Sequence, residues 1–394
     1  GGIESPLEAS PMPNNPWIKY SGSESNGFSI ATGIALASKI QERQFKSYVL
    51  MEESEINSGI TYETARFASK RKLDNLRVII EMPLENANNI KEYKKLWENF
   101  GWHAVSVDGH SIKELLKILN NAKKISMPII IFAQTKKGKG ISFLENTNKN
   151  NYLNDSEATQ AFLEIPKVRL PAIKIQKPKK INKKEQKEIH LPHSPYGVTE
   201  IISTRNACKN FLYRIINENS KNIILSSEEN NKIEQSLIGI AVGLSIKELQ
   251  PIIFANSDNL LKAHNQIKNA SLSKANIIIF GDNSGISKIN EGISYTCLED
   301  IPLFRTLPNS TVLYPSDALS TEKLSLQALQ NTGVIYLRTT NYESSILYNY
   351  TEDFPIGDFK ILESSKEDKV VVIGTGITVH EALKAKTELK KMRI

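Results

Sequence analysis

Residues 47–81, "SYVLMEESEINSGITYETARFASKRKLDNLRVIIE", decide the fold class of this chain. An apolar run at 47–51 precedes an amphipathic stretch at 61–72, and a second apolar run follows at 76–81. Both runs are continuous, which is typical of strands buried on both faces of a parallel sheet. The stretch therefore predicts a strand, a covering helix and a second strand parallel to the first.

The same alternation fills two long parts of the chain. In the first part, further strands are expected at 103–107 and 128–135, and helices at 25–40, 90–100 and 111–124. In the second part, strands are expected at 222–227, 250–256, 275–281, 311–317 and 333–340, and helices at 207–219, 234–248 and 321–330. One more strand (369–376) and one more helix (379–392) follow, and such a pair cannot bury its own faces.

This pattern predicts an α/β protein with two doubly wound parallel-sheet domains. The last segment is either the truncated start of a third domain or must dock on a neighbour. The expected boundaries are 1–165 for the first domain, 166–195 for a linker, 196–345 for the second domain and 346–394 for the incomplete third. The linker is expected because residues 166–195 hold five prolines and many lysines without an apolar period.

Composition indicates a soluble protein of a reducing compartment. The two cysteines, Cys208 and Cys297, lie far apart in the sequence and fit neither a disulfide framework nor a metal knuckle. No run approaches the roughly 18 apolar residues of a membrane span, and the first residues lack a signal pattern. We therefore expect the cytoplasm or an organelle lumen.

The net charge of +7 does not by itself indicate a nucleic-acid partner. Lysine is the main cation, and much of the excess lies in residues 166–193. A nucleic-acid partner is therefore not expected. A polyanion-binding module that uses the lysine-rich linker stays open as an alternative, and steep salt dependence of binding would support it.

Several motifs, in order along the chain, resemble the transketolase family. They are "MEESEINSGITYETARFASKRKLDNL" (51–76), "FGWHAVSVDGHSIKELL" (100–116), "AQTKKGKGISFLEN" (133–146), "IEQSLIGIAVGLS" (233–245), "SGISKINEGISYTCLEDIPLFRTLPNSTVLYPSDA" (284–318) and "VVVIGTGITVHEALKA" (370–385). The resemblance implies a thiamine-diphosphate fold with a diphosphate-binding and a pyrimidine-binding domain. It also implies active sites between two chains.

The diphosphate site departs from the family pattern. The resemblance implies Gly-Asp-Gly after the strand near residue 50, and this chain has Glu52, Glu53 and Ser54 there. Glu53 could supply an oxygen to Mg²⁺, but Glu52 adds a carboxylate beside an anionic diphosphate. Pro83 falls near the position of the family's second metal ligand, an asparagine, which therefore has no counterpart there, because proline offers no side-chain oxygen.

The histidines that the resemblance implies are also replaced. Ala9 and Ser10 stand where the family has a glycine and a histidine that reaches the cofactor and substrate. Tyr295 stands where the family has a substrate-handling histidine. Near 147–152, "TNKNNY" replaces a segment with another histidine.

Glu234 matches the family glutamate that donates a hydrogen bond to the cofactor's pyrimidine ring. The resemblance therefore implies a catalytic role, which is idle if no cofactor binds. A simpler interpretation is that a carboxylate in the first turn of a helix interacts favourably with the helix dipole. Both interpretations remain open from the sequence.

Because the strands and helices persist while site residues are lost, the sequence predicts a transketolase-like pseudoenzyme that serves as a structural or dimerisation subunit. No cofactor or metal is expected. The partner would be a second copy, a related transketolase-like chain or a larger assembly, with 61–72 and 234–248 as candidate interface helices. The alternative is a divergent active transketolase that transfers a two-carbon ketol unit between sugar phosphates. It would use thiamine diphosphate and Mg²⁺, with Glu53 as metal ligand and an imidazole such as His264 near the substrate.

Overall fold

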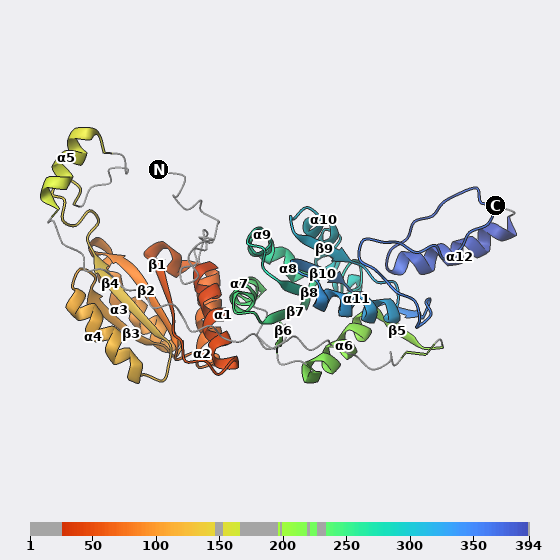
Figure 1. The fold of residues 1–394 in the computed structure, drawn as a ribbon, viewed down its shortest axis with the longest axis horizontal. Helices are drawn as coiled ribbons and strands as arrows, with labels where there is room; N and C mark the ends of the chain where they lie inside the picture. The colour runs from red at the N-terminus through yellow and green to blue at the C-terminus, as the bar shows by residue number, and fades with distance from the viewer. Residues whose placement is uncertain are drawn as a thin grey trace.

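The computed structural model describes residues 26–145, 153–165, 196–197, 199–218, 221–226 and 234–392. Figure 1 shows two separate sheets, each with its own helices, and a last helix at the far end of the second unit. The described part contains a four-stranded sheet, a five-stranded sheet and a small two-stranded sheet. The prediction of two parallel-sheet α/β units is confirmed.

The first sheet has the strand order β1-β2-β4-β3, and all of its neighbours are parallel. The strands are β1 (Ser47–Glu52), β2 (Leu76–Pro83), β3 (His103–Asp108) and β4 (Ile129–Thr135). The central strand β4 is apolar on both faces over residues 129–133, and β2 buries side chains on both faces, as expected for a sheet with helices on each side. Val49 pairs with Val78 and Ile80 with Phe132 in this register.

Helices cover the first sheet on two faces. One face packs against α1 (Asn26–Ile40), α2 (Gly59–Lys70) and α3 (Ile90–Asn99), and the other against α4 (Ile112–Asn121). Phe28, Trp97 and Trp102 form the aromatic centre of the first face, with the two tryptophan rings 5.0 Å apart. Short 3₁₀ turns η1 (Glu53–Asn57), η2 (Leu84–Asn89) and η3 (Ala122–Lys124) follow β1, β2 and α4, and α5 (Asp155–Glu164) follows β4.

The second sheet has the order β6-β7-β8-β10-β9 and is also parallel. Its strands are β6 (Asn222–Ser226), β7 (Gln250–Asn256), β8 (Ile277–Asp282), β9 (Ser310–Leu313) and β10 (Val334–Arg338). One face packs against α6 (Thr204–Glu218) and α11 (Ala318–Gln330). The other packs against α7 (Glu234–Ile246), α9 (His264–Leu272) and α10 (Asp300–Arg305).

The remaining elements of this unit are small. They are α8 (Ser257–Leu260), η4 (Leu261–Ala263), η5 (Ile289–Glu291) and η6 (Ile293–Tyr295), together with the antiparallel pair β5 (Ile201–Ser203) and β11 (Glu343–Ser345). Both cysteines are buried and free, so the expectation that they form no disulfide is confirmed. Among the described residues, no helix is long and apolar enough to cross a membrane.

The two units meet where α1 packs against α7, and Figure 1 shows α7 between α1 and the second sheet. Glycines make the approach possible, because a Cβ on Gly33 would lie 2.1 Å from the Ile240 carbonyl oxygen. The small residues of α1 thus allow α7 to approach closely. The expectation that 234–248 forms an interface with another chain needs correction, because residues 236–244 are all buried within this chain.

The end of the chain differs from its sequence prediction. Helix α12 (Ile377–Lys391) forms, but residues 369–376 form no strand. Val371 and Ile373 are 85% and 90% exposed. A strand needs neighbours for its backbone N–H and C=O groups, and no described strand lies beside this run. The helix is held instead by the Nε2 atom of His380, 2.8 Å from the Ser316 carbonyl oxygen.

Candidate functional site

The candidate site lies at the carboxyl edge of the first sheet. Because β1, β2, β4 and β3 are parallel, their carboxyl ends meet at this edge, where α/β sheets commonly bind ligands. The structure brings the end of β1 and the end of β2 together there, since Glu52 pairs in register with Glu81. Glu53 and Ser54 directly follow the end of β1, and Pro83 is the last residue of β2.

Glu53 has a partner that the sequence interpretation missed. The Nδ2 atom of Asn86, in the turn η2 after β2, donates a hydrogen bond to Glu53 Oε2 at 2.5 Å. Pro83 ends the strand and contributes no side-chain oxygen, but the chain then folds back so that Asn86 reaches β1. An amide side chain thus lies beside Glu53, three residues beyond the position where the sequence interpretation looked for the family's asparagine. The three-residue offset from Pro83 concealed Asn86 in the sequence.

The turn after β1 is occupied by its own carboxylates. The Glu52 backbone N–H donates to the Glu55 carboxylate at 2.9 Å, and Glu52 and Ser54 are exposed. Three glutamates fall within residues 52–55, and the first glycine after them is Gly59. The backbone donor at the strand end that an anionic ligand could use is already taken by a protein anion.

These residues do not fit a diphosphate with its Mg²⁺. A diphosphate needs close backbone N–H donors and positive charge, whereas this turn supplies Glu52, Glu53 and Glu55. Within the described ranges, no group of three or more His, Cys, Asp or Glu side chains could hold a metal ion. Two like charges about 4 Å apart repel by roughly 1 kcal/mol in water and by more in a drier cleft.

The other strand ends of this edge are closed by internal contacts. The Lys136 backbone N–H donates to His110 Nε2 at 2.8 Å, which ties the turn after β4 to the turn after β3. The Lys136 side chain forms an ion pair with Glu145. Residues 136–140, "KKGKG", form a lysine-bearing turn, and His110 lies in the turn after β3.

A half-buried carboxyl, that of Glu63, links this unit to α7. Glu63 on α2 accepts a hydrogen bond from the Ser236 backbone N–H at 3.3 Å. Burial raises the pKa of Glu63, and the bond from Ser236 opposes that rise. The sequence interpretation missed Glu63, although it lies on the inward side of an amphipathic helix. Glu234, two residues before Ser236, begins α7, and its side chain lies outside the described part of the chain.

The carboxyl edge of the second sheet carries a buried ionic pair. Arg205 Nε donates to both carboxylate oxygens of Asp282, at 2.8 and 2.9 Å. Burial raises the pKa of Asp282, and Arg205 opposes that rise. Beside it, Arg338 Nε donates to Asp300 Oδ2 at 2.8 Å. Each arginine at this edge is therefore neutralised by an aspartate of the same chain.

The other predicted site residues lie away from these two ion pairs or outside the part of the chain that the structure describes. Tyr295 ends η6 and is 43% exposed on the loop between β8 and α10, and His264 begins α9. Ala9, Ser10, the segment 147–152 and the lysine-rich linker 166–195 lie outside the described residues. The polyanion alternative, which depends on that linker, stays a prediction.

Sequence comparisons match both units. A profile described as "Transketolase, thiamine diphosphate binding domain" matches residues 21–160, and "Transketolase, pyrimidine binding domain" matches residues 233–344. The human protein "Transketolase" is 34% identical over 435 aligned positions, which cover all of this chain and 68% of that protein. The human "Transketolase-like protein 2" is 30% identical over 431 positions with the same coverage.

Comparison of structures agrees on the fold. The crystal structure of transketolase from Campylobacter jejuni superposes with a TM-score of 0.74 at 19% identity, over 94% of this chain and 69% of that one. Identity at this level supports the architecture alone. The sequence relatives and the two matched profiles show that this chain belongs to the transketolase family.

Proposed function

We propose that this chain is a catalytically inactive transketolase-like protein that acts as a structural or dimerisation subunit. It keeps the two α/β units of the family and loses the residues that would hold the cofactor. We infer that it does not bind thiamine diphosphate with Mg²⁺ and does not transfer ketol groups.

The observation that carries this proposal is the 2.9 Å hydrogen bond that the Glu52 backbone N–H donates to the Glu55 carboxylate. A carboxylate already occupies a donor at the strand end, and Glu52 and Glu53 flank it. An incoming diphosphate would have to displace one anion and approach two more, which is unfavourable in water and more so in a partly dry cleft.

The structural role rests on one further feature. Members of the family are typically oligomeric. The partner could be a second copy, a transketolase-like chain or a larger assembly, and we propose self-association as the first case to test.

Three measurements on the purified chain test the proposal. Calorimetric titration with thiamine diphosphate and Mg²⁺ is expected to give no binding heat, and a ketol-transfer assay is expected to show no turnover. Sedimentation velocity over a range of protein concentrations is expected to show a dimer. Micromolar cofactor binding would contradict inactivity, whereas a strictly monomeric chain without any partner would contradict the structural role.

One observation favours a second candidate, a divergent active transketolase. Asn86 lies beside Glu53, and turning its carboxamide by 180° would place an oxygen there, giving a carboxylate and an amide oxygen of the kind that Mg²⁺ prefers. If this function holds, Asn86→Ala should weaken Mg²⁺-dependent cofactor binding, whereas Asn89→Ala, in the same turn, should not. Without any binding in the wild type, this candidate fails.

A further inference from the structure

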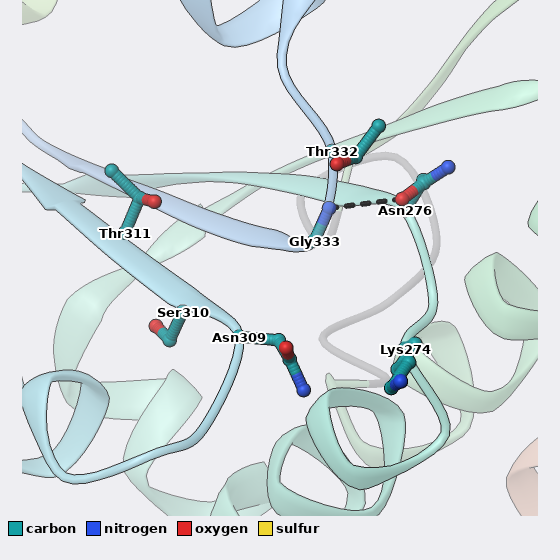
Figure 2. Close-up of a pocket in the computed structure, with 7 residues that line it drawn as sticks. All are labelled: Lys274, Asn276, Asn309, Ser310, Thr311, Thr332 and Gly333. Carbon is teal, nitrogen blue, oxygen red and sulfur yellow. Dashed lines mark hydrogen bonds between the residues drawn. The ribbon is translucent and has the colours of Figure 1, made fainter.

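A polar pocket at the amino ends of the strands of the second sheet, drawn in Figure 2, does not converge on a ligand. Its Asn276 side-chain oxygen accepts the Gly333 backbone N–H at 2.9 Å, and Asn309 Nδ2 donates to the Ser271 carbonyl oxygen at 3.5 Å. Figure 2 shows the other lining side chains pointing in different directions. The first sheet, in contrast, leaves an apolar surface open.

Part of one face of the first sheet is uncovered. In the register of this sheet, Leu50 of β1 lies beside Ile79 of β2, and Ile79 lies beside Ile131 of β4. Ile79 and Ile131 pack on the side of α4, so Leu50 and Tyr48 are on that side too. Ile131 is fully buried and Ile79 half-buried, whereas Leu50 is 72% and Tyr48 52% exposed. Helix α4 therefore covers β4 and leaves β1 open.

The flank of α4 that faces this open strand is also apolar. Ile112, Leu116, Leu119 and Lys123 follow one another at spacings of four, three and four residues, so they lie on one side of the helix and its extension. Lys123 is near Lys46, the residue before β1, because desolvation lowers the pKa of Lys46 and the charges of Arg77 and Lys123 lower it further. This side of α4 therefore faces β1.

The surface between α4 and β1 is here named the α4 groove. Ile112 and Leu116 are 74% and 55% exposed on its helical side. Lys46 and Lys123 give it a basic end at the start of β1. Parallel sheets are normally covered by helices on both faces, and an exposed apolar surface with a charged rim is typical of an interaction site. The α4 groove thus has room for one more helix.

Helix α5 exposes an apolar surface of its own. Phe162 and Leu163 are 75% and 82% exposed, and Figure 1 shows α5, in yellow, apart from the helices that cover the first sheet. The Glu164 carboxylate accepts the Ser142 backbone N–H at 2.5 Å and the Ser142 hydroxyl at 2.8 Å. These bonds hold α5 away from the α4 groove of its own chain.

The size and charge of α5 fit the α4 groove. Helices α4 and α5 both have ten residues, so each is about 15 Å long and spans a similar length of sheet. Helix α5 carries Asp155, Glu157 and Glu164 and neither lysine nor arginine. Its charge is therefore opposite to that of Lys46 and Lys123 at the end of the groove.

We propose that the α4 groove of one copy of this chain binds α5 of a second copy, and that the reverse contact forms at the same time. The result is a two-fold dimer with two equivalent contacts. Phe162 and Leu163 of one copy then cover Tyr48 and Leu50 of the other, and both apolar surfaces leave water. This inference rests on the self-association in the proposed function and names its surfaces, and it does not depend on the loss of the cofactor.

Sedimentation velocity of the whole chain over a range of concentrations tests this contact. Leu50→Glu and Phe162→Glu should each raise the dimer dissociation constant about tenfold or more, because each places a carboxylate in an apolar contact. Tyr213→Glu is the matched control, since Tyr213 is 72% exposed on α6 of the second unit. Lys46→Glu should also weaken the dimer, and Lys91→Glu, at an exposed lysine on α3, should not. Circular dichroism of dilute samples should show that these variants stay folded.

Crosslinking identifies the occupant of the groove. Cys208 and Cys297 are buried, so Leu50→Cys and Phe162→Cys each introduce one reactive thiol. A short bismaleimide should join a tagged Leu50→Cys copy to an untagged Phe162→Cys copy. Crosslinking only within one chain of the double variant would overturn the second copy as occupant.

The outcomes separate this contact from self-association itself. A dimer that Leu50→Glu and Phe162→Glu leave unchanged would overturn the contact between α5 and the α4 groove, while self-association would stand. A wild-type chain that stays monomeric at every concentration would overturn both.

Discussion

The Gly33 Cα and the Ile240 carbonyl lie so close that no side chain fits between them: an added Cβ would approach the carbonyl oxygen to 2.1 Å. Gly33 belongs to α1 and Ile240 to α7, so this contact joins the two α/β units. Gly243 contributes to the same contact, since its own Cβ would lie 2.2 Å from the Ile30 carbonyl oxygen. Backbone-to-backbone packing of this kind tolerates no added volume.

Gly33→Ala is therefore expected to destabilise the protein by about 1–3 kcal/mol, through overpacking between α1 and α7. Thermal or urea unfolding followed by circular dichroism measures this effect. Gly59→Ala is the matched control, because a Cβ at Gly59, at the start of α2, meets no atom within 4 Å. The control should be neutral or slightly stabilising. Equal melting temperatures for Gly33→Ala and wild type would contradict the close contact.

Rebuilding Gly-Asp-Gly at the end of β1 should not restore cofactor binding. In the triple variant Glu52→Gly, Glu53→Asp, Ser54→Gly, the Glu55 carboxylate can still accept the residue-52 backbone N–H, and Pro83 still provides no amide. Calorimetric titration with thiamine diphosphate and Mg²⁺ is expected to stay silent. Micromolar binding by the triple variant would show that Glu55 and Pro83 are not the obstacle. If the triple variant stays silent, adding Glu55→Ala to it tests whether the Glu55 carboxylate is the obstacle.

Glu63 should make stability fall as pH rises. Burial raises its pKa in the folded state above the value in the unfolded chain, so the folded state binds the proton more tightly. Stability is then greatest below the unfolded pKa and declines as pH rises toward the folded pKa. Glu63→Gln keeps an acceptor for Ser236 and removes this titration. It should stabilise the protein at pH 7 and leave it unchanged at pH 4.

Urea unfolding at several pH values measures this difference. Glu98→Gln, an exposed glutamate on α3, provides the control and should show no comparable pH dependence. If Glu63→Gln is less stable than wild type at pH 7, the ionised carboxylate is a favourable partner of Ser236, and burial is not the dominant influence on Glu63.

Breaking the pair of Arg205 and Asp282 should be costly. Arg205→Met leaves the Asp282 carboxyl, which is 1% exposed, without its cation, and such losses cost about 3 kcal/mol or more. Because burial raises the pKa of Asp282 and Arg205 opposes this, removing Arg205 raises that pKa further. The destabilisation should therefore be larger at pH 8 than at pH 5, where protonation of Asp282 relieves it.

The matched comparison is Lys39→Met, which removes a surface ion pair with Asp74 in which both side chains are about 40% exposed. Exposed pairs contribute about 0–1 kcal/mol, so this variant should unfold near the wild-type temperature. Similar losses for Arg205→Met and Lys39→Met would mean that the second sheet does not depend on its buried pair.

Hydrophobic periodicity was enough to predict most of the fold. Continuous apolar runs such as 76–81 and 250–256 became parallel strands, because a run without alternation has no solvent face. The strand expected at 369–376 did not form. Its residues have the right composition, but a strand exists only with a hydrogen-bonded neighbour, and sequence pattern does not supply one.

The candidate site was predicted less completely. Replacement of glycine by Glu52 was visible in the sequence, and so was Pro83 in place of an amide. The contact between Asn86 and Glu53 was not visible in the sequence. It forms because the turn η2 folds the chain back, so that a residue three positions after Pro83 reaches Glu53. Glu63 escaped notice for a similar reason, since its partner Ser236 lies 173 residues away in sequence.

The sequence by itself determined that this chain forms two parallel α/β units and carries carboxylates where its family places glycine. Both are local properties, set by apolar periodicity and by residue identity. Only the tertiary structure decided that Asn86 reaches Glu53 and that α7 is covered by α1. Such features depend on distances between segments remote in sequence, which packing of the whole chain fixes.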